Sequence, residues 1–252
     1  MNKKQIKKIK KLFSITLLIF FISLISLSII NYLNKINHFN IKKIIVEGND
    51  FINDEDIRRI VNDFLENENI LNLNLGSLKK SINNNKYIQS NKLYTYLPST
   101  LCIEINEISP RGFYEIKNKI FLLDNMSNNI EADIDAINFY NIPVISSDNE
   151  ELIDLSKTST ILNNIFNYNN TLFSIINEIQ FRDDQKIYIY LNNKTKIKLN
   201  SKNITRNLNV LFSFINTTQN SKELSSYKYI DLTINDQVIV KEKKIKIWIT
   251  NI

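Results

Sequence analysis

The chain has 252 residues, of which 43% are hydrophobic, so it can build a packed core and is not an intrinsically disordered chain. Its net charge of +6 matches six lysines among the first eleven residues, and the remainder is therefore close to neutral. Because that remainder lacks a concentrated basic face, we expect no nucleic-acid partner. The single cysteine excludes an intramolecular disulfide.

An uncharged apolar stretch runs from residue 12 to residue 33. A helix needs about 20 such residues to cross a bilayer, so the stretch predicts a transmembrane helix. A cleaved signal peptide and a buried helix are the alternatives, and the length of the stretch argues against both. The lysine-rich tail 1–11 predicts a cytoplasmic N-terminus and places the C-terminal domains on the periplasmic side.

Residues 39–108 show the pattern of a small α+β domain with the order β-α-α-β-β. Apolar residues recur at helical spacing after Asn53, which is a suitable N-cap. Around residue 103, apolar and polar residues alternate instead, which is typical of a strand. The expected elements are a strand over 41–49, a helix containing Ile57, Ile60, Val61 and Phe64, a helix containing Leu75, Leu78 and Ile82, and strands over 87–97 and 101–107.

Residues 109–252 predict a mixed β domain with packed helices, so the fold class of the whole chain is α+β. The expected elements are a hairpin over 111–124 that turns at Lys117-Asn118, a helix over 152–166, strands over 179–182, 186–191 and 194–199, a helix over 204–215 capped by Ser201, and a hairpin of 229–234 with 237–241 around Asn235-Asp236. In the tail 243–252, Ile245, Ile247 and Ile249 alternate with other residues, which could add one more strand.

Two motifs carry a resemblance to a known family. Val46-Glu47-Gly48-Asn49 and the run Tyr96-Leu97-Pro98-Ser99-Thr100-Leu101-Cys102-Ile103-Glu104-Ile105-Asn106-Glu107 resemble a POTRA domain. A POTRA domain directly after one N-terminal membrane helix resembles the bacterial cell division family FtsQ/DivIB. Tyr229-Ile230-Asp231-Leu232 is similar to a strand of the family's β domain, with Thr233 in the place of the usual arginine.

The resemblance implies a non-catalytic scaffold of the division machinery. Such a protein sits in the inner membrane at the division septum, recruits the FtsB–FtsL coiled-coil pair and links early and late division proteins to control septal peptidoglycan synthesis. The POTRA domain helps to recruit it to the septum. Carried over by position, the resemblance implies that the partner-binding residues are Tyr229, Leu232, Thr233, Ile234, Gln237, Val238, Ile239, Val240 and Lys241. For Val238 and Val240, a plain core role is equally open.

The sequence offers little for catalysis. The only histidine, His38, and the only cysteine, Cys102, do not predict a catalytic set, and zinc would lack its usual ligands. Three glycines do not make a phosphate-binding loop. The acid pairs Glu150-Glu151 and Asp183-Asp184 are expected to be solvated or to cap helices. We therefore expect no catalytic residues, no metal, no cofactor and no small-molecule substrate.

Two other functions remain as alternatives. The first is a transport or secretion component of the inner membrane that uses its POTRA domain for docking, but the chain is short for an attached β-barrel and is interrupted by helices. The second is an enzyme of the cell wall, which lacks a usable set of reactive side chains.

Overall fold

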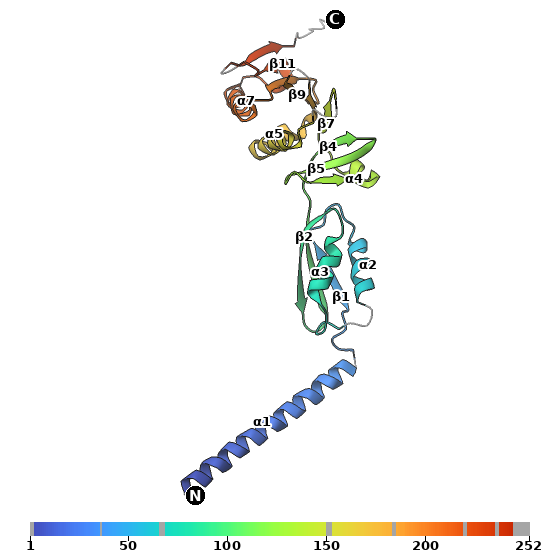
Figure 1. Cartoon of the computed structure of the whole chain (residues 1–252), viewed down its shortest axis with the longest axis vertical. Coiled ribbons are helices and arrows are strands. Elements are labelled where there is room, and N and C mark those ends of the chain that lie inside the picture. The colour runs from blue at the N-terminus through green and yellow to red at the C-terminus, as the bar shows by residue number, and fades with distance from the viewer. Residues whose placement is uncertain are drawn as a thin grey trace, which may run out of the picture. The chain divides into compact units, whose positions relative to one another are not determined.

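The structure is a computed structural model of the whole chain (Figure 1). It describes residues 3–35, 37–65, 69–149, 153–182, 185–218, 221–234 and 237–243. These divide into two compact units, Met1–Glu107 and Ile108–Ile252. Both units mix helices with strands, and the predicted α+β class is confirmed.

Helix α1 spans Lys3–Lys35. Its segment Lys10–Leu33 has a mean hydropathy of 2.6 and is long and apolar enough to cross a membrane. Four hydroxyl groups of this segment, those of Thr16, Ser23, Ser26 and Ser28, donate to backbone carbonyl oxygens three or four residues earlier in the helix, at 2.7–2.9 Å. Internal pairing of this kind lets polar side chains enter a medium that offers no water.

The rest of the first unit is a three-stranded sheet with two helices. The elements are β1 (Lys43–Glu47), α2 (Asp54–Phe64), α3 (Leu75–Asn83), β2 (Ile88–Tyr96) and β3 (Thr100–Glu107). Strand β3 lies in the centre, parallel to β1 and antiparallel to β2. The fully buried side chains come from both helices and from alternate positions of β3; they include Ile57, Leu78, Ile82, Leu101 and Ile103. The predicted element order is therefore confirmed.

The loop after β1 packs closely against the end of β3. Gly48 has φ +82°, and a Cβ atom there would lie 2.3 Å from the carbonyl oxygen of Ile105, so only glycine fits. The Glu107 carboxylate accepts hydrogen bonds from the backbone N–H groups of residues 50–52 at 2.8–3.2 Å. This glycine and this glutamate thus fix the loop that leads into α2.

The second unit is built on one nine-stranded mixed sheet. Its strands are β4 (Pro110–Ile116), β5 (Lys119–Asp124), β6 (Asn129–Glu131), β7 (Val144–Ser147), β8 (Ile176–Phe181), β9 (Lys186–Leu191), β10 (Lys196–Asn200), β11 (Tyr227–Asp231) and β12 (Ile239–Glu242). Their spatial order is β12-β11-β10-β9-β8-β7-β4-β5-β6. The β4–β7, β7–β8 and β10–β11 pairs are parallel, and the other pairs are antiparallel.

Helices α5 and α7 lie on one side of these strands (Figure 1). The helical elements of the unit are α4 (Ile134–Phe139), α5 (Leu155–Tyr168), α6 (Asn170–Ser174), α7 (Ile204–Thr218) and the 3₁₀ turn η2 (Leu224–Ser226). Alternate strand residues such as Ile189 and Ile197 pack with helix residues such as Leu162 and Leu208 in one core. The opposite strand positions carry half-buried tyrosine and lysine side chains, so the sheet has one apolar face and one more polar face.

Several elements differ from those expected. Helix α5 begins at Leu155 because the Asp154 side chain accepts the N–H of Lys157 and caps it. Strand β11 ends at Asp231, because the carboxylate of this residue accepts both the N–H and the hydroxyl of Thr233 and turns the chain away from the sheet. The short elements α4, β6 and α6 were not predicted. Asn235-Asp236, both acid pairs and the tail strand after Lys243 lie outside the described residues.

Candidate partner-binding edge

Strand β12 is the terminal strand of the nine-stranded sheet, and β11 is its neighbour. Among the residues that the structure describes, no strand pairs with its other side. An exposed strand edge presents unpaired N–H and C=O groups that can pair with another chain. This is the place where the sequence predicted the edge strand.

The backbone hydrogen bonds show which groups of β12 point outward. Leu232 donates its N–H to Lys198 on the β10 side, so the alternate residues Tyr229 and Asp231 turn their backbone groups toward β12. Lys243 donates its N–H to Ser226 on the β11 side. The alternation along β12 therefore turns the N–H and C=O groups of residues 240 and 242 outward.

The side chains at this edge differ in exposure. Ile234, Ile239 and Val240 are 48%, 40% and 37% exposed, so each can contribute apolar surface to a contact with another chain. Gln237 and Lys241 are also exposed. Three apolar side chains thus accompany the free backbone groups.

Four of the predicted partner-binding residues lie partly or wholly inside. Leu232 is 1% exposed and belongs to the core, so its predicted role in partner contact does not fit the structure. Val238 is half-buried and packs against the same core. Tyr229 and Thr233 are half-buried as well. The Lys198 ammonium group lies over the Tyr229 ring, 4.6 Å from the ring centroid.

A polar cluster holds the end of β11 beside this edge. Lys198 and Asp231 form an ion pair at 2.9 Å, with side chains that are 25% and 18% exposed. Burial raises the pKa of Asp231, but hydrogen bonds from Thr233 and Lys198 outweigh burial, so the pKa lies below its ordinary value. Asp231 thus remains ionised and keeps the strand end fixed.

The sequence indicated no role for Lys198 or Lys243, and it indicated Asp231 only as part of the motif Tyr229-Ile230-Asp231-Leu232. The spacing Asp231-Leu232-Thr233 is a recognisable signal, because an aspartate often accepts the N–H group two residues on and ends a strand. The Lys243 ammonium group donates to the carbonyl oxygens of Asn193 at 2.7 Å and Ser225 at 2.8 Å. No local pattern reveals that contact, because both acceptors come from segments distant in the sequence.

The reactive side chains named from the sequence are far from this edge in the chain. Cys102 is a free, half-buried thiol on β3, on the face opposite the buried Leu101 and Ile103. His38 follows α1 and contacts the ring of Phe39. Within the described ranges, no group of three or more His, Cys, Asp or Glu residues is arranged to hold a metal ion.

The more polar face of the sheet carries a tyrosine pair. The rings of Tyr188 and Tyr190 meet edge to face at 6.4 Å, and the Lys196 ammonium group lies 4.0 Å and 5.2 Å from their centroids. The Tyr190 hydroxyl group also donates to Gln180 at 3.1 Å. These contacts satisfy the rings within the sheet, as expected for side-chain packing between strands.

Comparison with known proteins identifies the first unit. Residues 39–107 match the family model of the FtsQ-type POTRA domain. The cell division protein FtsQ of Rickettsia bellii is 28% identical over 97 residues, which are 38% of this chain and 36% of that protein. FtsQ of Rickettsia prowazekii is 26% identical over 96 residues, with the same coverage. The matched region therefore spans about a third of the length of these relatives.

Among solved structures, the extracytoplasmic domain of the cell division protein DivIB from Geobacillus stearothermophilus matches at 9% identity. The match has a TM-score of 0.30 and covers 47% of this chain and 99% of that one. The resemblance read from the two sequence motifs is confirmed. Residues 39–107 form an FtsQ-type POTRA domain, and through this domain the chain is related to the FtsQ/DivIB family of bacterial cell division proteins.

Proposed function

We propose that the chain is a non-catalytic scaffold of the bacterial division machinery, held in the inner membrane by α1. The lysine-rich N-terminus stays in the cytoplasm, and both compact units lie in the periplasm. The scaffold binds FtsB- and FtsL-like coiled-coil proteins at the septum and thereby controls septal peptidoglycan synthesis. The FtsQ-type POTRA domain directly after an apolar helix supports the division role.

The observation that carries the binding part of the proposal is the outer edge of β12, which no strand of the described residues covers. Two residues with outward backbone groups offer two donors and two acceptors to an incoming strand. The exposed side chains of Ile239 and Val240 supply apolar contact beside those bonds. A partner strand would bury this area and complete the edge.

A proline substitution at Val240 tests this mode of binding. Proline removes one outward N–H group and leaves the β11–β12 ladder intact, since proline is tolerated at a sheet edge whose N–H faces solvent. We expect Val240→Pro to weaken capture of the purified FtsB–FtsL-like pair from the same organism by at least tenfold, or about 1.4 kcal/mol. The measurement is the affinity of the purified pair for the full chain, which is held in nanodiscs that are immobilised on a surface.

The opposite edge of the sheet provides a matched control. Backbone bonds from Asp124 to Asn128 and from Ala132 to Ile120 turn residue 129 outward on β6. Asn129→Pro therefore places the same substitution on β6, the other terminal strand of the described sheet, which the proposal does not use, and this variant should bind the pair like the unaltered chain. If Val240→Pro binds equally well, the β12 edge is not the partner site.

A further inference from the structure

The exposed apolar side chains of the POTRA domain gather at one end of it. Among the described residues between 37 and 107, the large apolar side chains that are exposed belong to Leu71, Tyr94, Tyr96 and Leu97. Tyr96 and Leu97 lead into the β2–β3 turn and are 63% and 65% exposed, and Leu71, in the connection from α2 to α3, is 50% exposed. Tyr94 lies on the same face of β2 as Tyr96.

This end is the one at which the chain enters the domain. The N–H groups of Lys42 and Lys43 donate to the carbonyl oxygen of Ser99 at 2.9 Å and 3.2 Å. The N–H group of Ile70 donates to the carbonyl oxygen of Phe39 at 2.9 Å. The β2–β3 turn and the α2–α3 connection therefore both lie beside the first residues of the domain.

The connection from α1 to this end is short. His38 donates its N–H to the carbonyl oxygen of Leu33 at 3.0 Å, and Leu33 is the last residue of the apolar segment of α1. Lys42 follows His38 by four residues, and an extended chain of that length spans at most about 14 Å. The Ser99 carbonyl group thus lies within roughly 20 Å of the end of the apolar segment, whatever the inclination of the helix.

A tether of this length brings the end of the domain within reach of the membrane surface. The hydrocarbon core of a bilayer is about 30 Å thick and the whole bilayer about 40–45 Å, so each headgroup layer is roughly 5–8 Å deep. Tyrosine is enriched in this layer, because its ring is apolar and its hydroxyl group is polar. Tyr32 stands one residue before the end of the apolar segment, which is a position typical of an interfacial anchor.

Charges along the sheet favour the same surface. Lys42 and Lys43 are exposed at the end where the chain enters. Glu47 and Glu104, which pair in register, are exposed about four residues farther along β1 and β3. Anionic lipid headgroups attract cationic side chains and repel acidic ones. This polarity suits a domain whose entry end faces an anionic bilayer surface.

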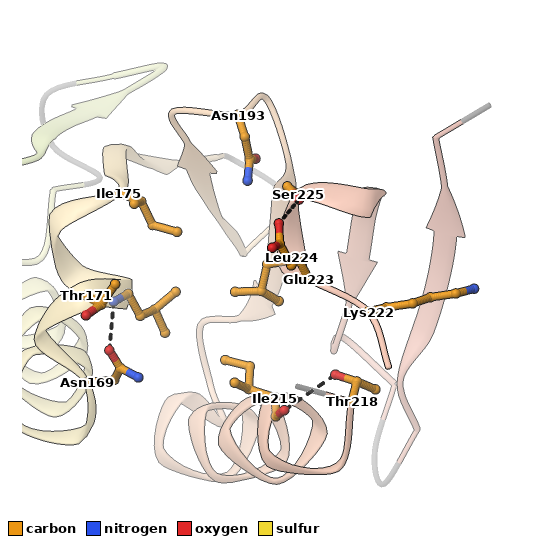
Figure 2. A pocket seen from close by; sticks show the side chains of 11 residues that line it. Asn169, Thr171, Ile175, Asn193, Ile215, Thr218, Lys222, Glu223, Leu224 and Ser225 are labelled. Carbon is orange, nitrogen blue, oxygen red and sulfur yellow. Dashed lines mark hydrogen bonds between the residues drawn. The ribbon is translucent and has the colours of Figure 1, made fainter. Parts of the chain in front are cut away.

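A cavity of the second unit shows how a covered apolar surface differs from this end. The cavity lies between α6, α7 and η2 and has a volume of about 360 Å³. The side chains of Ile175, Ile215 and Leu224 point toward one another across it (Figure 2). All three are half-buried and pack against the core, so they already shield one another. Tyr96 and Leu97 instead turn most of their surface outward.

A partner strand beside β2 is the rival occupant, because β2 is a terminal strand of the described three-stranded sheet. Such a strand would run along β2 and contact Tyr94 and Tyr96. Leu71 lies beside the chain that leads into β1, at the opposite edge of the sheet. A surface across the end of the domain reaches all of these side chains, so the bilayer fits them better than a strand does.

We propose that the end of the POTRA domain that carries Leu71, Tyr96 and Leu97 rests in the headgroup layer of the bilayer that α1 spans, with Lys42 and Lys43 facing lipid phosphates. The inference rests on the membrane placement in the proposed function and extends it. A second contact beside α1 holds the domain at the membrane surface, so the domain does not swing freely on its tether.

Quenchers carried by lipids test this contact. In a Cys102→Ser background, Leu97→Cys is labelled with bimane, and the full chain is placed in nanodiscs of phosphatidylglycerol and phosphatidylcholine that include lipids with a nitroxide near the headgroup. We expect these lipids to quench the label at position 97 severalfold more than a label on Ser90→Cys, which is exposed toward the other end of β2. Equal quenching at the two positions would overturn the proposal.

A label on Leu71→Cys covers the case in which a label at position 97 disturbs the turn. Its quenching should fall severalfold when Tyr96→Ser and Leu97→Ser are introduced together, and undiminished quenching would contradict a contact made by these side chains. Lys42→Glu should also lower it, whereas Lys80→Glu makes the same change of charge at an exposed position of α3 and should not.

The remaining outcomes separate this contact from its rival and from the proposed function. If the label at position 97 is shielded from a water-soluble quencher only after a partner protein is added, β2 accepts a strand and the membrane contact is refuted. The measurements contain no FtsB–FtsL-like pair, so a failure of capture at β12 does not alter them. A chain that does not enter the nanodiscs would refute the membrane helix on which both proposals rest.

Discussion

The Glu107 carboxylate makes the sharpest prediction for the POTRA domain. It accepts four contacts of 2.8–3.2 Å from the N–H groups of residues 50–52, and Ile52 is only 5% exposed. A hydrogen bond to a charged group contributes about 1.5–3 kcal/mol, and water replaces the bonds of exposed N–H groups at little cost. The bond from buried Ile52 should contribute its full free energy, and the bonds from the more exposed N–H groups only a small part of theirs. We therefore expect Glu107→Ala to destabilise the domain by about 2–3 kcal/mol.

This loss has two measurable consequences in the soluble fragment 37–252. For a domain of 60–100 residues, 1 kcal/mol shifts the melting temperature by about 4–8 °C, so Glu107→Ala should lower the melting temperature of the POTRA domain by roughly 8–24 °C. Hydrogen exchange should also accelerate at the amides of residues 50–52. Glu107→Gln keeps one acceptor oxygen but turns an amide donor toward the N–H of Phe51. Its melting temperature should therefore lie between those of the unaltered chain and of Glu107→Ala.

Glu104 on the same strand provides the control. Its carboxylate bonds to Lys92 and Tyr94 on the exposed face of the sheet, where water competes for the same groups. Glu104→Gln should therefore leave the melting temperature nearly unchanged. If Glu107→Ala melts like this control and its amides exchange at the same rate, the carboxylate does not hold the loop.

Two further predictions concern the strand ends. Gly48→Ala should destabilise the POTRA domain by at least about 2 kcal/mol in urea unfolding, because the positive φ and the contact with the Ile105 carbonyl both oppose a Cβ atom; an unchanged midpoint would contradict this close approach. Because the pKa of Asp231 is lowered in the folded chain, its contribution to stability is present above about pH 4, the ordinary range of Asp, and is lost as the pH falls further. Asp231→Asn should flatten this acid dependence in melting curves measured from pH 6 to pH 3, and an equally steep loss in the variant would exclude Asp231 as its source.

Local chemistry made some parts of this fold predictable from the sequence. Lys117 and Asn118 both have positive φ, as a tight two-residue hairpin turn requires, and the hairpin was predicted at that pair. The Asn53 side chain accepts the N–H of Glu55 and starts α2, as its position before the apolar pattern indicated. In each case, the information lies within a few residues of the element.

Other features depend on contacts between distant segments, which a periodic pattern does not encode. The parallel pairing of β10 with β11 follows from the return of the chain through α7, and the sequence showed only two separate strands. From the sequence, Leu232 is expected to end an exposed strand. In the structure, Asn207 donates a hydrogen bond to the carbonyl oxygen of Leu232, and the Leu232 side chain is buried in the core. The predicted partner-binding set therefore included a buried residue, Leu232, at the point where the chain after β11 enters the core.

The position of β12 in the chain has a consequence for the timing of assembly. Proteins are synthesised from the N-terminus, and β12 comprises four of the last five residues that the structure describes. Within the described part of the chain, its one strand neighbour is β11, which in turn pairs with β10 once α7 has crossed over. A nascent chain that has already completed its POTRA domain therefore has no β12 edge, and a truncated or stalled product would reach the membrane without the proposed means of capturing a partner.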